Sequence, residues 1–260
     1  MKRLLRAAVG AACSFLLMHP AAAQWQGKAG LGLRHASHAE YEEDRVLVRE
    51  RGWLPGIVLE GAYHSGNATW FAAAEGYRAA IGYRGQSQLG AAARSRTATT
   101  LATLRLGGSY QLAAQFALTA ALEADLWRRD IRSTDDAAGL LERYRSERFV
   151  FGAAHTWRPS SGVVLTELAL VLATPERMRV DFSGLLDSAS LTTRRAPGVR
   201  VGTRFVPALS PHLELRAAYD WMRIERSDDA PLTRNGRFAG TVAQPEHVRQ
   251  GITLTLSRLF

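Results

Sequence analysis

The sequence ends in Gly251-Ile252-Thr253-Leu254-Thr255-Leu256-Ser257-Arg258-Leu259-Phe260. Apolar residues alternate here with Thr and Ser at a period of two, which is typical of a β-strand with one apolar and one polar face. The strand runs up to its terminal aromatic residue, with no polar segment after it. A last strand of this kind suggests a sheet that closes on itself, in which the final strand pairs with the first.

The same alternation recurs along the chain and predicts ten strands. The expected segments are about 24–37, 52–64, 68–84, 98–111, 115–129, 144–158, 162–174, 196–207, 211–226 and 247–260. Short connections rich in Gly, Ser, Asn or Pro alternate strictly with long, charged ones, and such short connections are typical of tight turns. All the long connections therefore lie at one end of the sheet.

This layout predicts an all-β fold, an antiparallel up-and-down transmembrane β-barrel of about 10 strands. Barrels of this class have short periplasmic turns and longer extracellular loops. A closed sheet is needed because an unpaired backbone group finds no partner in hydrocarbon. A soluble β-sandwich is the alternative fold, but its Greek-key connections do not predict strict alternation of long and short loops.

The final strand resembles the closing strand of Gram-negative outer-membrane β-barrel proteins. Ile252, Leu254, Leu256 and Phe260 carry the resemblance, and Arg258 departs from it because the family prefers an apolar or aromatic residue there. The resemblance implies that the barrel-assembly machinery reads this strand during biogenesis. It also implies a location in the cell outer membrane.

Residues 1–23 read as a cleaved signal peptide, which leaves residues 24–260 as the barrel domain. Lys2, Arg3 and Arg6 precede an apolar stretch that is too short for a transmembrane anchor, and Ala21-Ala22-Ala23 supplies small residues for cleavage. Lipidation of Cys13 is a weaker alternative. Cys13 is the only cysteine, so the mature chain has no disulfide and no thiol chemistry.

The chain carries a formal charge of +9, almost all of it from Arg. The arginines are scattered and form no basic run, which argues against nucleic acid as a partner. Scattered Arg also suits anionic lipid headgroups. We therefore expect outer-membrane lipid and lipopolysaccharide as partners, and a monomer.

Charged residues fall on the strand face opposite the apolar one, which would line the barrel lumen. The predicted lumen charge network comprises Glu60, Arg78, Arg105, Glu123, Asp125, Glu167, Arg200, Arg204, Glu214, Arg216 and Asp220. Lys28, Arg34 and Arg148 share this parity. Glu75 breaks the expected parity of its strand and suggests a bulge. Buried charges need partners, so a lumen filled by ion pairs is favoured over a path for polar solutes.

Aromatic residues near the predicted strand ends suggest two interfacial girdles. The expected periplasmic girdle comprises Trp25, Tyr63, Tyr110, Phe116, Trp157 and Phe260. The expected outer girdle comprises Trp53, Tyr83, Trp127, Phe149 and Trp221.

Only one His/carboxylate constellation can be assembled on the outer side. His35, His38 and His247 lie near the outer ends of the first and last strands, with Asp44, Glu246 or Asp228 as acidic neighbours. The alternative function is thus an outer-membrane hydrolase at the outer rim, an omptin-like protease or a lipid A-modifying enzyme. No catalytic motif supports it, and the spacing predicts no metal or cofactor. We expect a non-enzymatic barrel that serves envelope structure, surface binding or limited solute passage.

Overall fold

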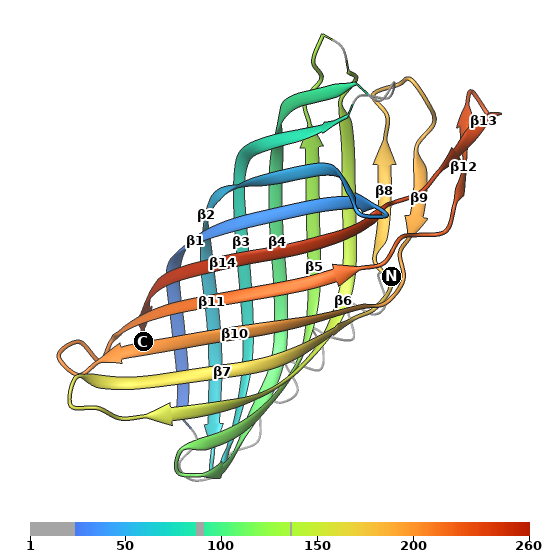
Figure 1. Ribbon diagram of the computed structural model, residues 1–260. Coiled ribbons are helices and arrows are strands. Elements are labelled where there is room, and N and C mark those ends of the chain that lie inside the picture. Colours follow the sequence, from blue (N-terminus) through green and yellow to red (C-terminus); the bar gives the residue numbers. More distant parts are fainter. Residues whose placement is uncertain (1–23, 87–90, 136) are drawn as a thin grey trace.

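The computed structural model describes residues 24–86, 91–135 and 137–260. The predicted signal peptide, residues 1–23, lies outside them. Ten long antiparallel strands close into one barrel in up-and-down order, as the sequence predicts (Figure 1). No helix in the described residues is long and apolar enough to cross a membrane.

The barrel strands match the ten predicted segments in order and position. They are β1 (Gln24–Glu42), β2 (Arg45–Ser65), β3 (Ala68–Gln86), β4 (Ala92–Ala113), β5 (Phe116–Ile131), β6 (Leu140–Trp157), β7 (Gly162–Ala173), β10 (Ala196–Pro207), β11 (Leu213–Ile224) and β14 (Glu246–Leu259). Pairing of β14 with β1, from Lys28 opposite Leu259 to Tyr41 opposite Glu246, closes the seam. The final strand therefore pairs with the first.

Apolar side chains cover the outer wall over most of its height. On β14 the outward residues Leu256, Leu254 and Ile252 are each 45–50% exposed, while Thr255 and Thr253 between them are buried inside. Leu31, Ile57, Leu122 and Leu170 are similarly exposed on other strands. An apolar surface that encircles the whole barrel is unfavourable in water and fits the hydrocarbon of a bilayer.

The long connections are mostly extensions of the strands rather than irregular loops. β1 and β2 continue well past their predicted ends and join in a tight turn at Glu43-Asp44. The predicted boundaries were wrong here because the outward residues change from apolar to charged while the alternation itself continues. A strand can leave the lipid and remain a strand, since only its outward side chains have to change.

Two hairpins extend the wall at the long-connection end. β8 (Arg177–Asp181) and β9 (Ala189–Thr192) pair with each other, and β8 also pairs with the upper part of β6. β12 (Ala230–Arg234) and β13 (Arg237–Val242) form a separate hairpin beside them (Figure 1). The Asp187 carboxylate holds this second hairpin by accepting hydrogen bonds from the Thr233 hydroxyl at 2.7 Å and the Gly236 N–H at 2.9 Å.

An apolar cluster lies at the long-connection end of the barrel, where these hairpins meet β5 and β6. Its buried members are Trp127, Tyr144, Met178, Val180, Ala189 and Leu191, and Leu232 and Val242 of the second hairpin pack against them. We call this group the apolar cap. It places Trp127 inside the barrel, and Tyr83 is also buried and inward-facing. Both were wrongly expected in the outer aromatic girdle, because residues above the lipid no longer follow the apolar-outward rule.

Candidate functional site

The charged interior of the barrel is the candidate site. The described strands place Glu60, Arg105, Glu123, Asp125, Glu167, Arg200, Arg204, Glu214, Arg216 and Asp220 on inward positions. Arg78 is the exception, because its side chain is exposed on the outer wall next to the buried, inward Tyr77.

The expectation of a bulge at Glu75 was wrong. β3 pairs with β2 in a single register, with Gly76 opposite Ile57 and Glu75 opposite Val58. Glu75 thus lies inside on regular parity. The small outward residues of this strand, Ala72, Ala74 and Gly76, obscured which face was apolar, and this also misplaced Arg78.

The first group of ion pairs lies toward the short-turn end of the barrel. Lys28 on β1 places its ammonium nitrogen 2.8 Å from Glu214 on β11 and 3.0 Å from Glu60 on β2. Arg204 on β10 reaches Glu60 across the lumen at 3.3 Å. Lys28 is 8% exposed and Glu214 6% exposed, so these charges fill the interior at this level.

A second group joins β1, β3 and β11 in the middle of the barrel. Arg34 donates two hydrogen bonds to Asp220, at 2.9 and 2.8 Å. Arg216 donates to Glu75 at 3.0 Å, and the Tyr77 hydroxyl donates to the same carboxylate at 3.1 Å. The Arg34–Asp220 pair is bidentate, and such pairs have a defined geometry, so Asp220 orients the Arg34 guanidinium in the lumen.

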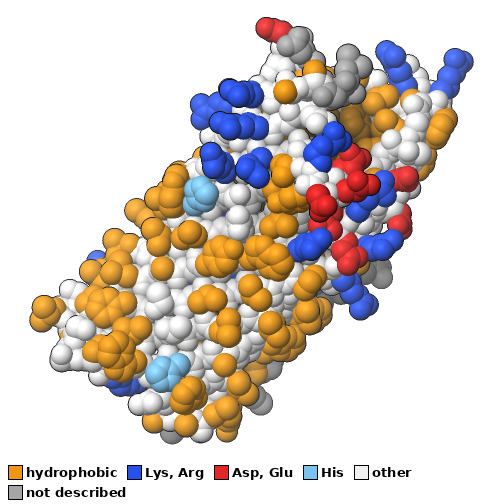
Figure 2. Space-filling view, viewed as in Figure 1, with side chains coloured by type: hydrophobic (Ala, Val, Ile, Leu, Met, Phe, Trp, Pro, Cys, Tyr) orange, Lys and Arg blue, Asp and Glu red, His pale blue; other side chains and the backbone are white. Residues whose placement is uncertain are grey.

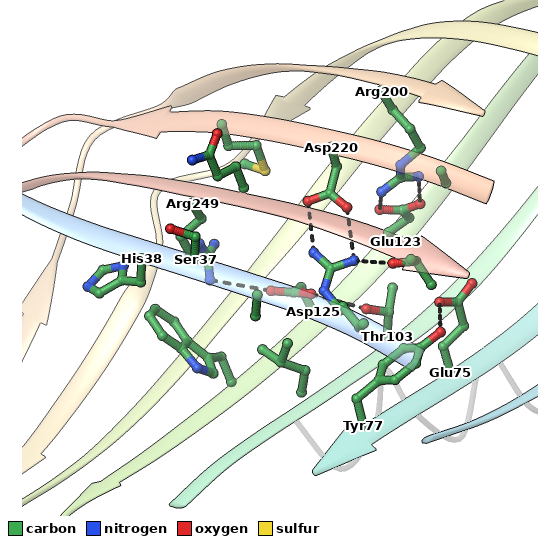
Figure 3. Close-up of a pocket in the computed structure, with 18 of the residues that line it drawn as sticks. Ser37, His38, Glu75, Tyr77, Thr103, Glu123, Asp125, Arg200, Asp220 and Arg249 are labelled. Atoms are coloured by element: carbon green, nitrogen blue, oxygen red, sulfur yellow. Dashed lines mark hydrogen bonds and ion pairs between the residues drawn. The ribbon is translucent and has the colours of Figure 1, made fainter. Parts of the chain in front are cut away.

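A third group is built on the two acids of β5. Glu123 accepts two hydrogen bonds from Arg200, at 2.5 and 3.1 Å, and Arg105 lies 3.4 Å away (Figure 3). Asp125 accepts from Arg148 at 2.5 Å, and Arg249 lies 3.6 Å from it. Neighbouring strands therefore contribute alternating signs, and each acid here contacts two arginines.

A cavity of about 90 Å³ remains between the second and third groups. Figure 3 shows Asp125, Arg200 and Asp220 around it, engaged with partners from other strands, and Glu75 hydrogen-bonded to Tyr77 of its own strand. One water molecule needs on the order of 10–15 Å³ of such space. The cavity therefore has room for several water molecules between the ion pairs.

A separate cluster, which we call the Arg129 cluster, lies beside the apolar cap at the long-connection end of this cavity. Arg129 on β5 contacts three carboxylates: Glu142 at 2.5 Å, Glu40 at 2.9 Å and Glu50 at 3.0 Å. Tyr144 donates to Glu142 at 2.9 Å. Arg129 is 1% exposed and Glu50 0% exposed, so one cation and three acids share a fully buried site.

The Arg129 cluster lies above the apolar band of the wall. Glu50 lies between the exposed, outward Arg49 and Arg51, and Arg129 follows the exposed, outward Arg128. The apolar stretches of the outward rows on these two strands end at Trp53 and Leu126, which lie nearer the short-turn end than the cluster. The cluster is therefore outside the lipid-covered part of the barrel.

The excess of acid in this cluster affects its proton binding. Burial raises the pKa of Glu142 to about 7, and the charges of Glu40 and Glu50 add to the rise although Arg129 opposes it. Burial also acts to raise the pKa of Glu40, but Arg129 and His38 outweigh it and hold that pKa well below its usual range. Glu142 therefore keeps its proton to a higher pH than an ordinary carboxyl does.

The three predicted outer-rim histidines do not lie together. His38 and His247 face inward with ring centroids 5.2 Å apart, and their rings contact Trp127 and Tyr144 respectively. His35 lies on the outer face against Trp53. Residues three apart on a strand point to opposite faces, so alternation alone separates His35 from His38.

The carboxylates near the inward histidines are not those expected. His38 Nε2 donates to Glu40 at 2.9 Å, and His247 Nε2 donates to Glu176 at 3.2 Å, while Arg249 lies 2.6 Å from Glu176. Burial lowers the pKa of His38 to about 3, and Arg129 adds to the effect. In the described part of the chain no group of three or more His, Cys, Asp or Glu is arranged to hold a metal ion.

Sequence reasoning missed most of the Arg129 cluster. Glu40, Glu50 and Glu142 fall in connections between the predicted strands, because the outward positions there no longer carry the regular apolar residues that mark a strand in lipid. The sequence did carry one signal. The alternation of Arg49, Glu50 and Arg51 continues the period of β2 past Trp53, which places Glu50 on the inward face.

Comparison with known proteins shows the fold of the chain. No family model and no curated protein matches the sequence. The crystal structure of the outer membrane protease OmpT from Escherichia coli matches with a TM-score of 0.56 and 10% identity, over 90% of this chain and 95% of that one. The translocator domain of autotransporter NalP from Neisseria meningitidis matches at a TM-score of 0.49 and 13% identity, over 99% and 95%.

The attachment invasion locus protein Ail of Yersinia pestis matches at a TM-score of 0.38 and 10% identity, over 90% of this chain and 99% of that one. All three are outer-membrane β-barrels. Identities this low carry the fold and no activity. The match to OmpT, whose TM-score is above 0.5, therefore shows that the chain has the fold of an outer-membrane β-barrel.

Proposed function

We propose that the protein is an integral outer-membrane barrel with an occluded lumen, which acts in the envelope as a scaffold and through binding at its surface. Residues 1–23 would be removed on export, and the long-connection end would face outside the cell. Outer-membrane barrels with this orientation carry their longer loops on the extracellular side.

The main support for the proposal is that groups of buried side chains block the lumen at several levels. The Lys28 group and the two groups around the cavity follow one another from the short-turn end, and the Arg129 cluster and the apolar cap close the long-connection end side by side. Lys28, Glu123 and Arg129 are 8%, 3% and 1% exposed. A channel wide enough for hydrated ions would leave the side chains along it more exposed to water.

Barrel size supports the same conclusion. An 8-stranded barrel is just wide enough for side chains to fill, and the aqueous channels of general porins need about 16–18 strands. A ten-stranded barrel with many inward arginines is close in size to a barrel that side chains fill completely. Limited passage of small solutes is therefore the less favoured role.

Conductance in planar bilayers tests the proposal. We expect the purified, folded chain to insert without giving a steady ion current at pH 7. Heat-modifiable mobility on gels, measured on the same sample, checks that the barrel is folded. A stable conductance on the scale of a general porin would refute an occluded lumen.

A hydrolase is the second candidate, because two His–carboxylate pairs lie side by side at the long-connection end. Access argues against it, since His38 is 4% exposed, His247 0% and Glu176 2%. Assays with peptides and with lipid A would decide. Turnover that is lost in both His38→Ala and His247→Ala, yet kept in the outward His35→Ala control, would favour the hydrolase.

A further inference from the structure

Six arginines on one face of the outer wall form a charged surface without acidic partners. They are exposed and lie on β2, β3 and β4: Arg49, Arg51, Arg78, Arg84, Arg94 and Arg96. We call this surface the arginine face. In Figure 2 the Lys and Arg side chains gather toward the long-connection end, beyond the hydrophobic side chains of the wall.

The pairing register brings these like charges next to one another. Arg49 on β2 lies directly opposite Arg84 on β3, which lies opposite Arg94 on β4. Arg51 and Arg96 flank Gly82 in the row two residues nearer the lipid. Directly opposed like charges on a sheet are destabilising, so the row Arg49–Arg84–Arg94 costs stability unless an anion neutralises it.

The described residues supply no such anion. No ion pair joins any of the six to an acid of the described residues, and Arg96 bonds only the uncharged carbonyl of Ala80. The sequence has no Asp or Glu between Glu75 and Glu123, a span that includes residues 87–90. Arginines elsewhere on the outer wall do have partners, for example Arg143 with Asp181 at 2.6 Å and Arg177 with Glu147 at 2.7 Å.

The arginine face begins where the apolar band ends. On β2 the outward row runs through Leu59, Ile57 and Trp53 and then changes to Arg51 and Arg49. On β4 it runs through Leu106 and Leu104 before it reaches Arg96 and Arg94. The arginines project sideways from the barrel wall, at the height where the headgroups of a surrounding lipid would lie.

We infer that the arginine face binds the phosphate groups of a phosphorylated glycolipid anchored in the outer leaflet, which in the outer membrane is lipopolysaccharide. Guanidinium groups pair with phosphate in bidentate geometry. A ligand with its phosphates at this height places its acyl chains against the apolar band below. The inference rests on the proposed orientation in the outer membrane.

A lipid fits this surface better than a nucleic acid or a peptide. The side chains point outward from the side of the wall, and Arg51, Arg78 and Arg96 are the ones nearest the apolar band. Arg84 and Arg94 lie two residue pairs from the last pair of the β3–β4 hairpin. An acidic surface would need divalent cations to bridge it to phosphate groups. No described acidic side chain pairs with the arginine face, so it can bind the phosphates directly.

Binding of defined lipids to the purified barrel in an uncharged detergent tests the inference. The probes are bisphosphorylated lipid A, the same lipid with both phosphates removed, and inorganic phosphate, each without divalent cations. The variant Arg49→Gln/Arg84→Gln/Arg94→Gln removes the cross-strand row. The variant Arg143→Gln/Arg177→Gln/Arg223→Gln is the matched control, since those arginines are paired with acids.

We expect the wild-type barrel and the control to prefer bisphosphorylated over dephosphorylated lipid A. The row variant should lose affinity for the phosphorylated lipid by a factor on the order of 100 at low salt, at roughly fivefold for each arginine near a charged surface. Without lipid, the row variant should melt at the same temperature as wild type or higher, because like charges have been removed. That melting curve also shows that the variant folds.

Equal affinity of the wild-type barrel and the row variant for bisphosphorylated lipid A would overturn the inference. So would equal affinity for the dephosphorylated lipid, or inorganic phosphate that binds as tightly as the lipid. These results are independent of the conductance test. If the barrel conducts ions and binds lipid in a phosphate-dependent way, only the occluded lumen is refuted. If the barrel does not conduct and shows no such binding, only the lipid-binding role of the arginine face is refuted.

Discussion

Arg129 on β5 and Glu142 on β6 lie directly opposite each other, and the Arg129 guanidinium donates to the Glu142 carboxyl at 2.5 Å. Both side chains are buried at the long-connection end of the lumen. The same guanidinium also contacts Glu40 and Glu50, so a single cation holds β1, β2, β5 and β6 together above the lipid.

Removal of that cation should destabilise the barrel strongly. Arg129→Met keeps an unbranched side chain but leaves three buried acids without their counter-ion, and loss of one partner from a buried ion pair costs about 3–5 kcal/mol. We expect urea unfolding to show a loss of this order. Arg128→Met is the control, since Arg128 is exposed beside Asp130 and such surface pairs are worth about 0–1 kcal/mol. Similar losses for both variants would contradict this role.

Stability should depend on pH through Glu142. Burial raises the pKa of Glu142 to about 7 in the folded chain, above its ordinary value of 4.5. The folded state therefore binds a proton that the unfolded state releases between these values, and this contribution is lost as pH rises from about 4.5 through about 7. The free energy of unfolding of Glu142→Gln relative to wild type should increase from pH 5 to pH 8.

The free energy of unfolding of both proteins is measured by urea unfolding at each pH. The difference between the two values removes the contributions of other groups that titrate in this range. His38 acts in the opposite direction, because its pKa is lowered to about 3 and its contribution to stability is lost as pH falls below its ordinary value of 6.5. The wild-type profile alone is therefore flattened where the two overlap. A difference between the two proteins that stays constant or falls with pH would show that Glu142 is ionised throughout.

The orientation in the membrane can be tested with single cysteines. Asn235 lies in the β12–β13 turn and Ser161 in the β6–β7 turn, and both are exposed at opposite ends of the barrel. Asn235→Cys should react with an impermeant maleimide on intact cells, and Ser161→Cys should react only after lysis. Export would remove Cys13, so the mature chain adds no background. Labelling of Ser161→Cys on intact cells would reverse the orientation.

Phe260 should affect assembly more than stability. Its ring is 72% exposed, while its backbone N–H bonds the carbonyl oxygen of Gly27 at 2.9 Å. Phe260→Ala keeps that bond and loses only part of the roughly 1.5–3 kcal/mol available from burying a large apolar side chain. The resemblance to outer-membrane closing strands predicts a lower yield of heat-modifiable barrel in cells, with normal refolding into detergent.

Phe116→Ala is the matched control for this prediction, because Phe116 is an exposed aromatic residue at the same end of the barrel. It should have little effect on yield. If both variants lower the yield equally, the effect comes from the interfacial aromatic ring rather than from the closing strand. If Phe260→Ala fails to refold in detergent, the residue acts through stability.

The sequence alone determined the fold and most of the inward faces. The alternation of Ile252, Leu254 and Leu256 with Thr253 and Thr255 is a local property, because successive side chains of a strand point to opposite faces. Where lipid requires apolar residues, the inward face follows by elimination. The prediction was wrong where this requirement is absent, as at Arg78 among small residues and at Trp127 above the lipid.

Only the tertiary structure decided which inward charges meet. Lys28 and Glu214 are 186 residues apart, and Arg129 and Glu40 are 89 apart, yet each pair is within 3 Å. Alternation places a side chain on the inward face but does not give its height in the lumen. That height depends on the register of every strand pair around the closed sheet, and the partner across the lumen depends on the register and the closure together.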